Sequence, residues 1–280
     1  EPAAAAADHH QVVCRGCHGA ILTPVHACGR AVVYPMRMGI LRIATWNVNS
    51  LRVRLPQLAE WLATAQPDVV ALQETKTTDA DFPVAEIAAL GYQVAYTGQR
   101  TYNGVAVLSR EPLRVLATDI PGFPDEQRRV LAVETAGLTV LDLYVPNGQA
   151  PGSDKFAYKL RWLEALAAWL TGGLAGRDDL VVLGDFNIAP EDRDVHDPAA
   201  WVGSVHVSPE ERAALRRIVD GGLIDLFRRF EQPEAAYSWW DYRAGAFRRN
   251  HGLRIDLIFA RAALAARSEE HTSELQSRQY

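Results

Sequence analysis

Two patterns of apolar residues alternate along the middle of the chain. Short runs rich in Val, Leu and Ile, as in residues 41–47 and 68–72, predict β-strands, whereas apolar residues three or four positions apart in residues 54–65 predict an amphipathic helix. Pro67 separates this helix from the next strand, because the residue before a proline avoids helical geometry. The same criteria predict helices at residues 82–90, 155–170 and 209–219, and strands at residues 92–97, 104–109, 130–135, 139–145, 180–184 and 254–259.

The order of these elements predicts the fold class. Four strands follow one another between residues 92 and 145 with only Pro, Gly and Asn turns between them, which favours antiparallel pairing. Helices precede and follow this region, so we expect mixed sheets covered by helices, an α/β sandwich. No linker and no internal repeat divides the sequence, and we expect a single domain over residues 38–264.

Composition and charge narrow the class of protein. A chain of 280 residues that is 48% apolar and 22% charged is long enough for one large α/β domain. The net charge of −5 gives no global nucleic-acid signature, so contact with DNA or RNA requires a local basic patch. The sequence has no apolar run of about 18 residues, which excludes a membrane-spanning helix. All three cysteines precede residue 30, which suits a reducing compartment, and we expect a cytoplasmic monomer.

The two ends of the chain differ from the middle. We expect residues 1–37 to be a non-native or disordered leader, and residues 265–280 to be an artefactual tail. The tail prediction rests on residues 267–277, RSEEHTSELQS, which match a translated sequencing-library adapter; a disordered polar tail is the alternative. The leader holds the two candidate start residues, Met36 and Met38, and two weak motifs: a haem-type C-x-x-C-H at residues 14–18, and a zinc set that adds His26 and Cys28.

The most informative stretch is residues 180–190, LVVLGDFNIAP. Four β-prone residues bounded by Gly184 predict a buried strand, and an unpaired carboxylate at its exit, Asp185, is costly unless it has a role. If the extended conformation continues, Asn187 leaves the backbone on the same side as Asp185, and the two side chains can hold a water, a metal ion or both. The alternative for an isolated Asp-x-Asn is an Asx-turn that caps the loop.

Polar side chains occur at the ends of five predicted strands. Each has an ordinary explanation when taken alone: a turn residue, a surface charge, a tyrosine at the core edge or the partner of an arginine. Together they predict one crevice, because ligands in layered α/β folds collect where strands end. These residues are Asn47 and Asn49, Glu74, Tyr144 and Asn147, Asp185 and Asn187, and Asp256.

These residues lie in motifs that resemble those of exonuclease III and the related abasic-site (AP) endonucleases, within the endonuclease, exonuclease and phosphatase superfamily. The resemblance covers residues 38–264 and rests, in order, on ATWNVNSLR, PDVVALQETK, YNGVAVLSR, YVPNG, LGDFNIAP, SWWDYR and GLRIDLI. It implies a four-layered α/β sandwich with two mixed, largely antiparallel β-sheets packed between helices. It also implies a DNA-repair nuclease with 3′ to 5′ exonuclease and AP endonuclease activity on double-stranded DNA that carries abasic sites or 3′ ends.

The resemblance assigns a metal site and a water site. Glu74 matches the principal metal ligand of the family, with Asn47 close to the same ion. Oxygen ligands of this kind suit Mg²⁺, or Mn²⁺ in its place, and not zinc. Asp185 matches the residue that aligns and deprotonates the attacking water, and Asn187 lies beside it; we expect both near the metal ion as well. The implied chemistry is in-line attack of water on a phosphodiester without a covalent enzyme intermediate.

The resemblance also assigns contacts to the substrate. Tyr144 matches a phenol that touches the scissile phosphate, and Asn147 the amide beside it, while Asp256 matches a carboxylate that orients a histidine. The residues expected to contact DNA are Arg129, the tryptophans Trp239 and Trp240 against the base-free sugar, and Leu253 in the same pocket. Burial of either tryptophan in the core is the alternative, because tryptophan is usually largely buried.

The sequence departs from the family in one respect. The family ends in a strand that carries S-D-H-x-P, whose histidine contacts the scissile phosphate, and no such motif follows residue 264. The only Asp-His pair is Asp8-His9, and His251 lies in a loop before the last predicted strand. We therefore expect an uncovered sheet edge and severely impaired activity in this chain. Two alternative functions stay open: another phosphoesterase of the same superfamily, or a non-catalytic DNA-binding relative.

Overall fold

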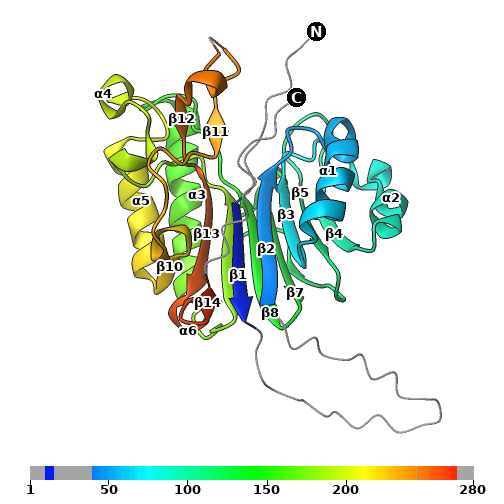
Figure 1. Ribbon diagram of the computed structural model, residues 1–280. Helices are drawn as coiled ribbons and strands as arrows, with labels where there is room; N and C mark the ends of the chain where they lie inside the picture. The colour runs from blue at the N-terminus through cyan, green and yellow to red at the C-terminus, as the bar shows by residue number, and fades with distance from the viewer. Residues whose placement is uncertain (1–9, 16–39, 244, 270–280) are drawn as a thin grey trace, which may run out of the picture.

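The computed structural model describes residues 10–15, 40–243 and 245–269, and these residues build two six-stranded sheets that pack face to face (Figure 1). The first sheet has the order β14-β1-β2-β3-β5-β4, and the second has the order β10-β13-β9-β8-β7-β6. Strands β2 and β3 pair in parallel, as do β8 and β9, and the other neighbours are antiparallel. The predicted pair of mixed, largely antiparallel sheets is therefore confirmed.

The strands are short and most are buried. Those of the first sheet are β1 (His10–Arg15), β2 (Ile40–Asn47), β3 (Val69–Gln73), β4 (Gln93–Thr97), β5 (Val105–Ser109) and β14 (Ser268–Glu269). Those of the second are β6 (Arg114–Ala117), β7 (Val130–Thr135), β8 (Leu138–Tyr144), β9 (Leu180–Asp185), β10 (Leu223–Asp225) and β13 (Asp256–Arg261). A separate hairpin consists of β11 (Trp239–Trp240) and β12 (Gly252–Leu253).

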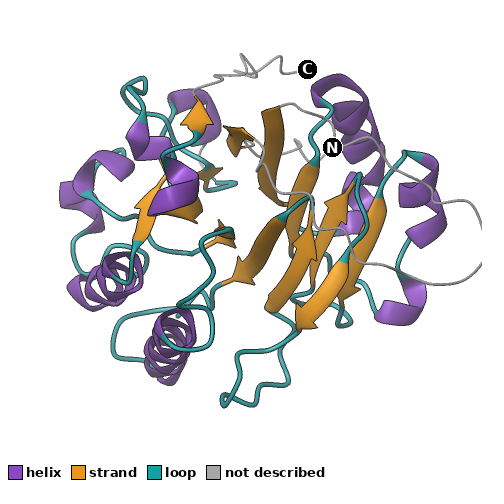
Figure 2. Ribbon diagram, turned by 90° about the horizontal axis from the view of Figure 1, so that it is seen from below, coloured by secondary structure: helices purple, strands orange, loops and turns teal. Residues whose placement is uncertain are grey.

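Helices cover the outer face of each sheet, so that the molecule has four layers (Figure 2). Helices α1 (Leu51–Ala65) and α2 (Val84–Ala89) lie on the first sheet, and the long helices α3 (Asp154–Thr171) and α5 (Pro209–Asp220) lie on the second. Two short helices, α4 (Pro198–Trp201) and α6 (Ala262–Ala265), are the remaining α-helices of the described residues. Helices predicted at residues 54–65, 82–90, 155–170 and 209–219 are all present, with ends that differ by a few residues. Among the described residues, no helix is long and apolar enough to cross a membrane.

Three apolar layers hold these elements together. The layer between the sheets contains residues of both, such as Ile43 of β2 and Leu183 of β9, which have no exposed surface. Trp61 of α1 packs in a second layer outside the first sheet, and Trp162 of α3 packs in a third layer outside the second sheet. Burial on both faces explains why β3, β5 and β9 read as continuous apolar runs rather than as alternating patterns.

The edge of β2 is paired, contrary to our expectation of an uncovered edge. Strand β1 lies in the segment that we predicted to be a leader, and it runs antiparallel to β2 with His10 opposite Thr45 and Arg15 opposite Ile40. Strand β14 pairs in turn with β1. The prediction that residues 1–37 and 265–280 are non-native remains a prediction. Asp8, His9, Cys17, His18, His26, Cys28, Met36 and Met38 lie outside the described residues.

Gly184 allows β9 to approach β8 closely at the end of the strand. Its φ is +137°, and a Cβ atom at this position would lie 2.0 Å from the carbonyl oxygen of Leu143 on β8. A side chain there would collide with backbone that cannot move away, so only glycine fits. The glycine before Asp185 thus lets β9 remain paired up to its last residue, and it fixes where the Asp185 carboxylate leaves the sheet.

Candidate active site

The polar residues at the strand ends converge on one end of the double sheet. In the first sheet, Asn47 is the last residue of β2, and Glu74 directly follows β3, its parallel neighbour. In the second sheet, Tyr144 at the end of β8 pairs with Asp185 at the end of β9, and Asp185 also pairs with Asp256 at the start of β13. The two parallel pairs therefore bring their carboxyl ends together, as expected for ligand sites in layered α/β folds.

Asn47 joins the two sheets at this end. Its Nδ2 atom donates to Glu74 Oε1 at 2.8 Å and to Asp185 Oδ2 at 2.9 Å. Its Oδ1 atom accepts a hydrogen bond from the backbone N–H of Asn49 at 3.0 Å, which fixes the orientation of the carboxamide. One amide group thus holds a carboxylate of each sheet, and Asn47, Glu74 and Asp185, which the resemblance assigns to one metal site, are mutual neighbours.

Glu74 is a charged carboxylate at the partly open side of the site. Burial alone would raise its pKa, but hydrogen bonds from Lys76 and Asn47 and the charge of Lys76 lower the pKa below its usual value. Lys76 Nζ lies 2.8 Å from Glu74 Oε2, and it also donates to Asn49 Oδ1. Lys76 was not predicted as a site residue from the sequence. Its position two residues after Glu74, in the motif LQETK, could have indicated that it lies in the site.

Asp185 has a carboxylate that is suited to take up a proton near neutral pH. Burial and the negative charge of Glu74 raise the pKa of Asp185 to about 7, against hydrogen bonds from Asn47 and from the Asn187 backbone that lower it. The Asn187 N–H donates to Asp185 Oδ1 at 2.8 Å, and Asn187 has a left-handed φ of +51°. The extended conformation therefore does not continue past Asp185. The Asx-turn weighed as an alternative is present, and Asp185 lies within the site as well.

Asp256 is buried beside Asp185. Burial, and then the charge of Asp185, raise the pKa of Asp256 well above its usual value. Its Oδ1 atom is buried and has no hydrogen-bond partner among the described residues. His251, which comes five residues earlier, stacks on His196 with ring centroids 4.7 Å apart. The structure thus places Asp256 in the acidic cluster, and its role in orienting a histidine remains a prediction.

Tyr144 directs its phenol toward the same carboxylates. Burial and the charges of Glu74 and Asp185 raise its pKa, so that the hydroxyl keeps its proton at any physiological pH. Arg129 lies over the ring, with its guanidinium carbon 4.6 Å from the ring centroid, and its Nη1 atom donates to the Tyr144 carbonyl at 3.2 Å. Gln127 Oε1 accepts two further hydrogen bonds from Arg129, at 2.8 and 2.9 Å.

Arg129 lies largely within the protein. The residue is only 9% exposed, and its hydrogen-bonding groups are directed to Tyr144 and Gln127; its contact to DNA remains a prediction. A guanidinium on the face of a partly buried phenol mainly fixes the position and charge environment of that phenol. This arrangement supports a role for Arg129 in holding the phenol of Tyr144 in position.

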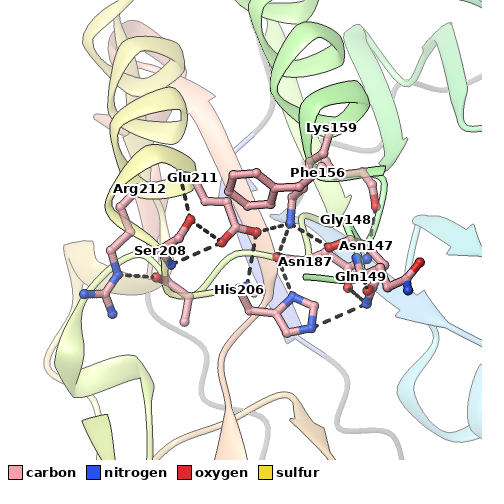
Figure 3. Close-up of polar contacts among 12 residues, drawn as sticks. Asn147, Gly148, Gln149, Phe156, Lys159, Asn187, His206, Ser208, Glu211 and Arg212 are labelled. Carbon is pink, nitrogen blue, oxygen red and sulfur yellow. Dashed lines mark hydrogen bonds and ion pairs between the residues drawn. The ribbon is translucent and has the colours of Figure 1, made fainter. Parts of the chain in front are cut away.

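Asn147 and Asn187 meet on the other side of Asp185. Asn147 Nδ2 donates to Asn187 Oδ1 at 3.2 Å, and Asn187 Nδ2 donates to the carbonyl of Val145 at 3.0 Å. Asn187 is buried, whereas Asn147 is exposed. Figure 3 shows Lys159, His206 and Glu211 beside these two residues: Lys159 and His206 contact their backbone, and Glu211 contacts Lys159 and His206. The sequence predicted the two amides and missed the three residues beside them.

The two tryptophans face different neighbours because side chains alternate along β11. Trp239 is partly exposed and lies across from His206, with ring centroids 6.3 Å apart, and it pairs with Leu253 of β12. Trp240 is buried against Phe247 and donates from Nε1 to Asn250 Oδ1 at 3.1 Å. Leu253 has no exposed surface and packs beneath Trp239. Only Trp239 of these three presents an aromatic surface toward the site.

The oxygen donors at this end of the sheets fit a magnesium-type ion. The described residues hold no group of three or more His, Cys, Asp or Glu side chains arranged to bind a metal. Glu74 and Asp185 supply one carboxylate each, joined by Asn47, and this is the donor set that Mg²⁺ uses when water and phosphate oxygens complete its coordination. Sulfur and imidazole donors, which zinc prefers, do not line this set.

Comparison with known proteins agrees with this geometry. Residues 44–278 match the Endonuclease/Exonuclease/phosphatase family. Exodeoxyribonuclease III of Haemophilus influenzae is 36% identical over 244 residues, which cover 81% of this chain and 90% of that protein. Two solved structures are similar: a 3′ phosphatase from Neisseria bound to a product DNA hairpin (42% identity, TM-score 0.76) and an AP endonuclease from Archaeoglobus fulgidus (37% identity, TM-score 0.78). Their alignments cover 80% and 81% of this chain and 88% of each structure.

The family match begins within β2 and includes every residue of the acidic cluster, and the TM-scores of 0.76 and 0.78 show that the two solved structures share this fold. The sequence motifs, the fold and the convergence of Asn47, Glu74, Asp185 and Asn187 thus lead to the same conclusion. The chain belongs to the Endonuclease/Exonuclease/phosphatase family.

Proposed function

We propose that this protein is a metal-dependent DNA-repair nuclease that hydrolyses phosphate esters at abasic sites and at 3′ ends of double-stranded DNA. The observation that carries the proposal is the position of Asp185, a buried carboxylate whose pKa is about 7, held by Asn47 against Glu74. Such a group can accept a proton from water at neutral pH. The 3′ phosphatase and AP endonuclease structures similar to this chain support the substrate class.

The residues of the site have separate tasks in this reaction. Asp185 orients a water and takes its proton as the water oxygen bonds to phosphorus and the bond to the 3′ oxygen breaks. The carboxamides of Asn147 and Asn187 and the protonated phenol of Tyr144 donate hydrogen bonds to the phosphoryl oxygens, where negative charge grows. Glu74 and Asn47, with Asp185 and Asn187 nearby, would hold Mg²⁺, or Mn²⁺ in its place. When bound there, the ion would neutralise charge at the phosphate and the departing oxygen.

The contacts to DNA follow from the exposed groups around the cluster. Trp239 offers an aromatic face at the site entrance, supported from below by Leu253, and we assign it to the sugar or base next to the scissile phosphate. Trp240 supports DNA binding indirectly, by holding the β11–β12 hairpin in shape, and Arg129 supports the reaction indirectly, by holding the ring of Tyr144 in position. A monomeric, cytoplasmic protein remains our expectation from the sequence.

The proposal is tested with the full chain in excess over labelled duplexes that carry an abasic analogue, a 3′ phosphate or an ordinary 3′ end. Single-turnover conditions detect even slow cleavage. We expect cleavage that requires Mg²⁺, stops with a chelator and disappears in Asp185→Asn. Cleavage that persists in Asp185→Asn, or DNA binding with no cleavage of any duplex by the wild-type chain, would refute the proposal.

A further inference from the structure

Lys159 lies in the middle of α3 with no exposed surface, and its ammonium group has three acceptors (Figure 3). Lys159 Nζ donates to Glu211 Oε1 at 2.5 Å, to the carbonyl of Asn187 at 2.7 Å and to the carbonyl of Asn147 at 3.2 Å. A lysine ammonium has three hydrogens, so all of its donors are used. A buried cation with this geometry is fixed and cannot act as a mobile surface charge.

The two carbonyls belong to residues that present their side chains to the proposed phosphate site. Asn147 follows β8, and Asn187 follows β9, the parallel neighbour of β8. Their carboxamides share a hydrogen bond, and His206 contacts both residues, with Nδ1 2.7 Å from the Asn187 carbonyl oxygen and Nε2 3.4 Å from Asn147 Nδ2. Lys159 joins the backbones of the two loops directly, at the two residues whose carboxamides we assign to the phosphate.

Glu211 holds the lysine in place from α5. Its Oε1 atom also accepts from the backbone N–H of His206 at 3.1 Å, while Oε2 accepts from the N–H and the hydroxyl of Ser208 at 3.1 and 2.6 Å. Ser208 is the N-cap of α5, and Glu211 completes its capping box. Both carboxylate oxygens are thus paired, and the position of Glu211 is set by the first turn of a helix.

A buried ion pair of this kind is not the best way to stabilise a fold. Removing two charges from water costs about as much as their attraction returns, and an apolar pair of similar volume is often equally stable or more stable. The additional hydrogen bonds to Asn147 and Asn187 are what an apolar pair cannot reproduce. A purely structural role could be filled by an apolar pair, whereas a role in positioning Asn147 and Asn187 requires these two hydrogen bonds.

We infer that Lys159, held by Glu211, is a positioning residue that fixes the backbones of Asn147 and Asn187 so that both carboxamides face the scissile phosphate. The inference rests on the proposed function, in which these carboxamides bind the phosphate. Lys159 does not touch the substrate itself, so its loss lowers the rate of the chemical step and leaves DNA binding largely intact.

The decisive variant is the double substitution Lys159→Met with Glu211→Met, compared with Lys159→Met alone. The single variant leaves a buried carboxylate without its cation, so both its Tm and its rate fall. The double variant regains thermal stability, but its single-turnover rate stays about tenfold or more below that of the wild type, with the apparent Kd for DNA within about twofold. Glu211→Gln, which keeps an acceptor at the same position, retains most of the rate.

Arg212→Met provides the matched control. Arg212 follows Glu211 on α5 and also donates to a loop carbonyl, that of Ala189, at 3.0 Å, but Ala189 carries no side chain for the phosphate. We expect its rate to equal that of the wild type. A double variant that is stable and fully active would overturn the inference, and so would an equal loss of rate in Arg212→Met.

A second measurement does not depend on catalysis. In protein labelled with ¹⁵N-asparagine, the side-chain NH₂ signals of Asn147 and Asn187, assigned from single Asn→Asp variants, should shift and exchange faster with water in the double variant. They should remain unchanged in Arg212→Met. If the wild-type chain cleaves no DNA, the proposed function fails, yet these signals still decide whether Lys159 positions the two amides; unchanged signals in a stable double variant would contradict it.

Discussion

Asp185 and Asp256 are directly paired residues on the antiparallel strands β9 and β13, and both carboxyl groups are buried. A negative charge on one of two neighbouring carboxylates opposes ionisation of the other, and burial opposes the ionisation of both. In the absence of a metal ion, the pair therefore retains protons at a pH where isolated aspartates are ionised. Asn47 and the Asn187 N–H offset part of this effect at Asp185, whereas Ser238 offsets part of it at Asp256, which keeps a buried Oδ1 with no hydrogen-bond partner among the described residues. This difference distinguishes the two carboxylates as candidates for the base.

The first prediction concerns stability and pH. The pKa of Asp185 is about 7 in the folded protein and about 3.9 in an unfolded chain. Protonated Asp185 therefore contributes stability that is fully present below pH 3.9 and is lost as the pH rises through 7. Asn cannot ionise, so Asp185→Asn should be more stable than the wild type in a chelator, and its gain in Tm should increase from pH 5 to pH 8. The difference at pH 8 is on the order of 2–4 kcal/mol.

Asp220→Asn controls for the loss of one negative charge, because Asp220 is an exposed carboxylate at the end of α5. Thermal unfolding at pH 5, 6, 7 and 8 in EDTA gives the comparison. An Asp185→Asn gain that stays constant over this range, or that Asp220→Asn reproduces, would show that ionisation of Asp185 is not the cause. Activity should be lost in Asp185→Asn at every pH.

The second prediction concerns the metal requirement. Glu74 is the charged, partly exposed carboxylate of the cluster, and Gln offers a similar shape without the negative charge. Glu74→Gln should raise the Mg²⁺ concentration for half-maximal cleavage by at least about tenfold, since one full charge is removed from an oxygen-donor site. A titration of the cleavage rate with Mg²⁺ measures the effect.

Lys76→Met tests the same site from the opposite side. The Lys76 ammonium lies 2.8 Å from Glu74 Oε2 and competes with a cation for that oxygen. Its removal should lower the Mg²⁺ concentration required, by a few-fold. The assignment of Glu74 as a ligand would be wrong if Glu74→Gln and Lys76→Met both left the Mg²⁺ titration of the wild type unchanged.

The site residues that we predicted from the sequence are those that lie at the ends of strands. Asp185 and Asn187 were found because a buried strand has a clear apolar pattern and a clear exit, and Glu74 was found for the same reason. The local conformation at Asn187 was predicted less well, because a left-handed residue and an Asx-turn interrupt the extended chain there. Lys159 was not predicted as a site residue. It lies inside a helix, and its partners are 12, 28 and 52 residues away in the sequence.

Tertiary contacts also decided which of two similar residues faces the site. Trp239 and Trp240 are adjacent and identical in kind, and only the pairing of β11 with β12 separates their environments. Arg129 matched a DNA contact in the resemblance, but it is buried over the ring of Tyr144. Strand β1 had no recognisable pattern because its role depends on the free edge of β2, which is distant in the sequence. Local patterns do not encode such choices.

The third prediction separates the two tryptophans. Trp240→Ala removes a buried ring that packs on Phe247, and it leaves Asn250 Oδ1 without its donor, so it should cost about 3–5 kcal/mol of stability. Trp239→Ala removes a partly exposed ring, so its main effect should be on DNA affinity, about tenfold, with a smaller loss of Tm. Binding to an abasic duplex in Ca²⁺ or EDTA, together with thermal unfolding, gives both values.

The opposite result, with Trp239→Ala more destabilising and Trp240→Ala more harmful to DNA binding at a temperature where both are folded, would reverse the assignment. Trp239→Phe is the conservative control. It keeps an aromatic face for stacking and should retain most of the affinity.

The fourth prediction concerns the phenol of Tyr144. Burial and the charges of Glu74 and Asp185 raise its pKa, so the group should act as a hydrogen-bond donor and never as a base. Tyr144→Phe removes only the hydroxyl and should lower the single-turnover rate by about tenfold to a hundredfold, with little change in Tm. Arg129→Met should produce a smaller loss of rate, because it acts on the position of the ring.

Spectrophotometric titration in EDTA tests the protonation state directly. Tyrosinate absorbs near 295 nm, and the difference between the wild type and Tyr144→Phe isolates this one residue among the nine tyrosines. We expect no difference up to about pH 10, where an unperturbed tyrosine is half ionised. A difference that rises between pH 8 and pH 10 would mean that Tyr144 ionises readily, and a rate that rises with it would identify the phenolate, instead of Asp185, as the group that takes the proton from water.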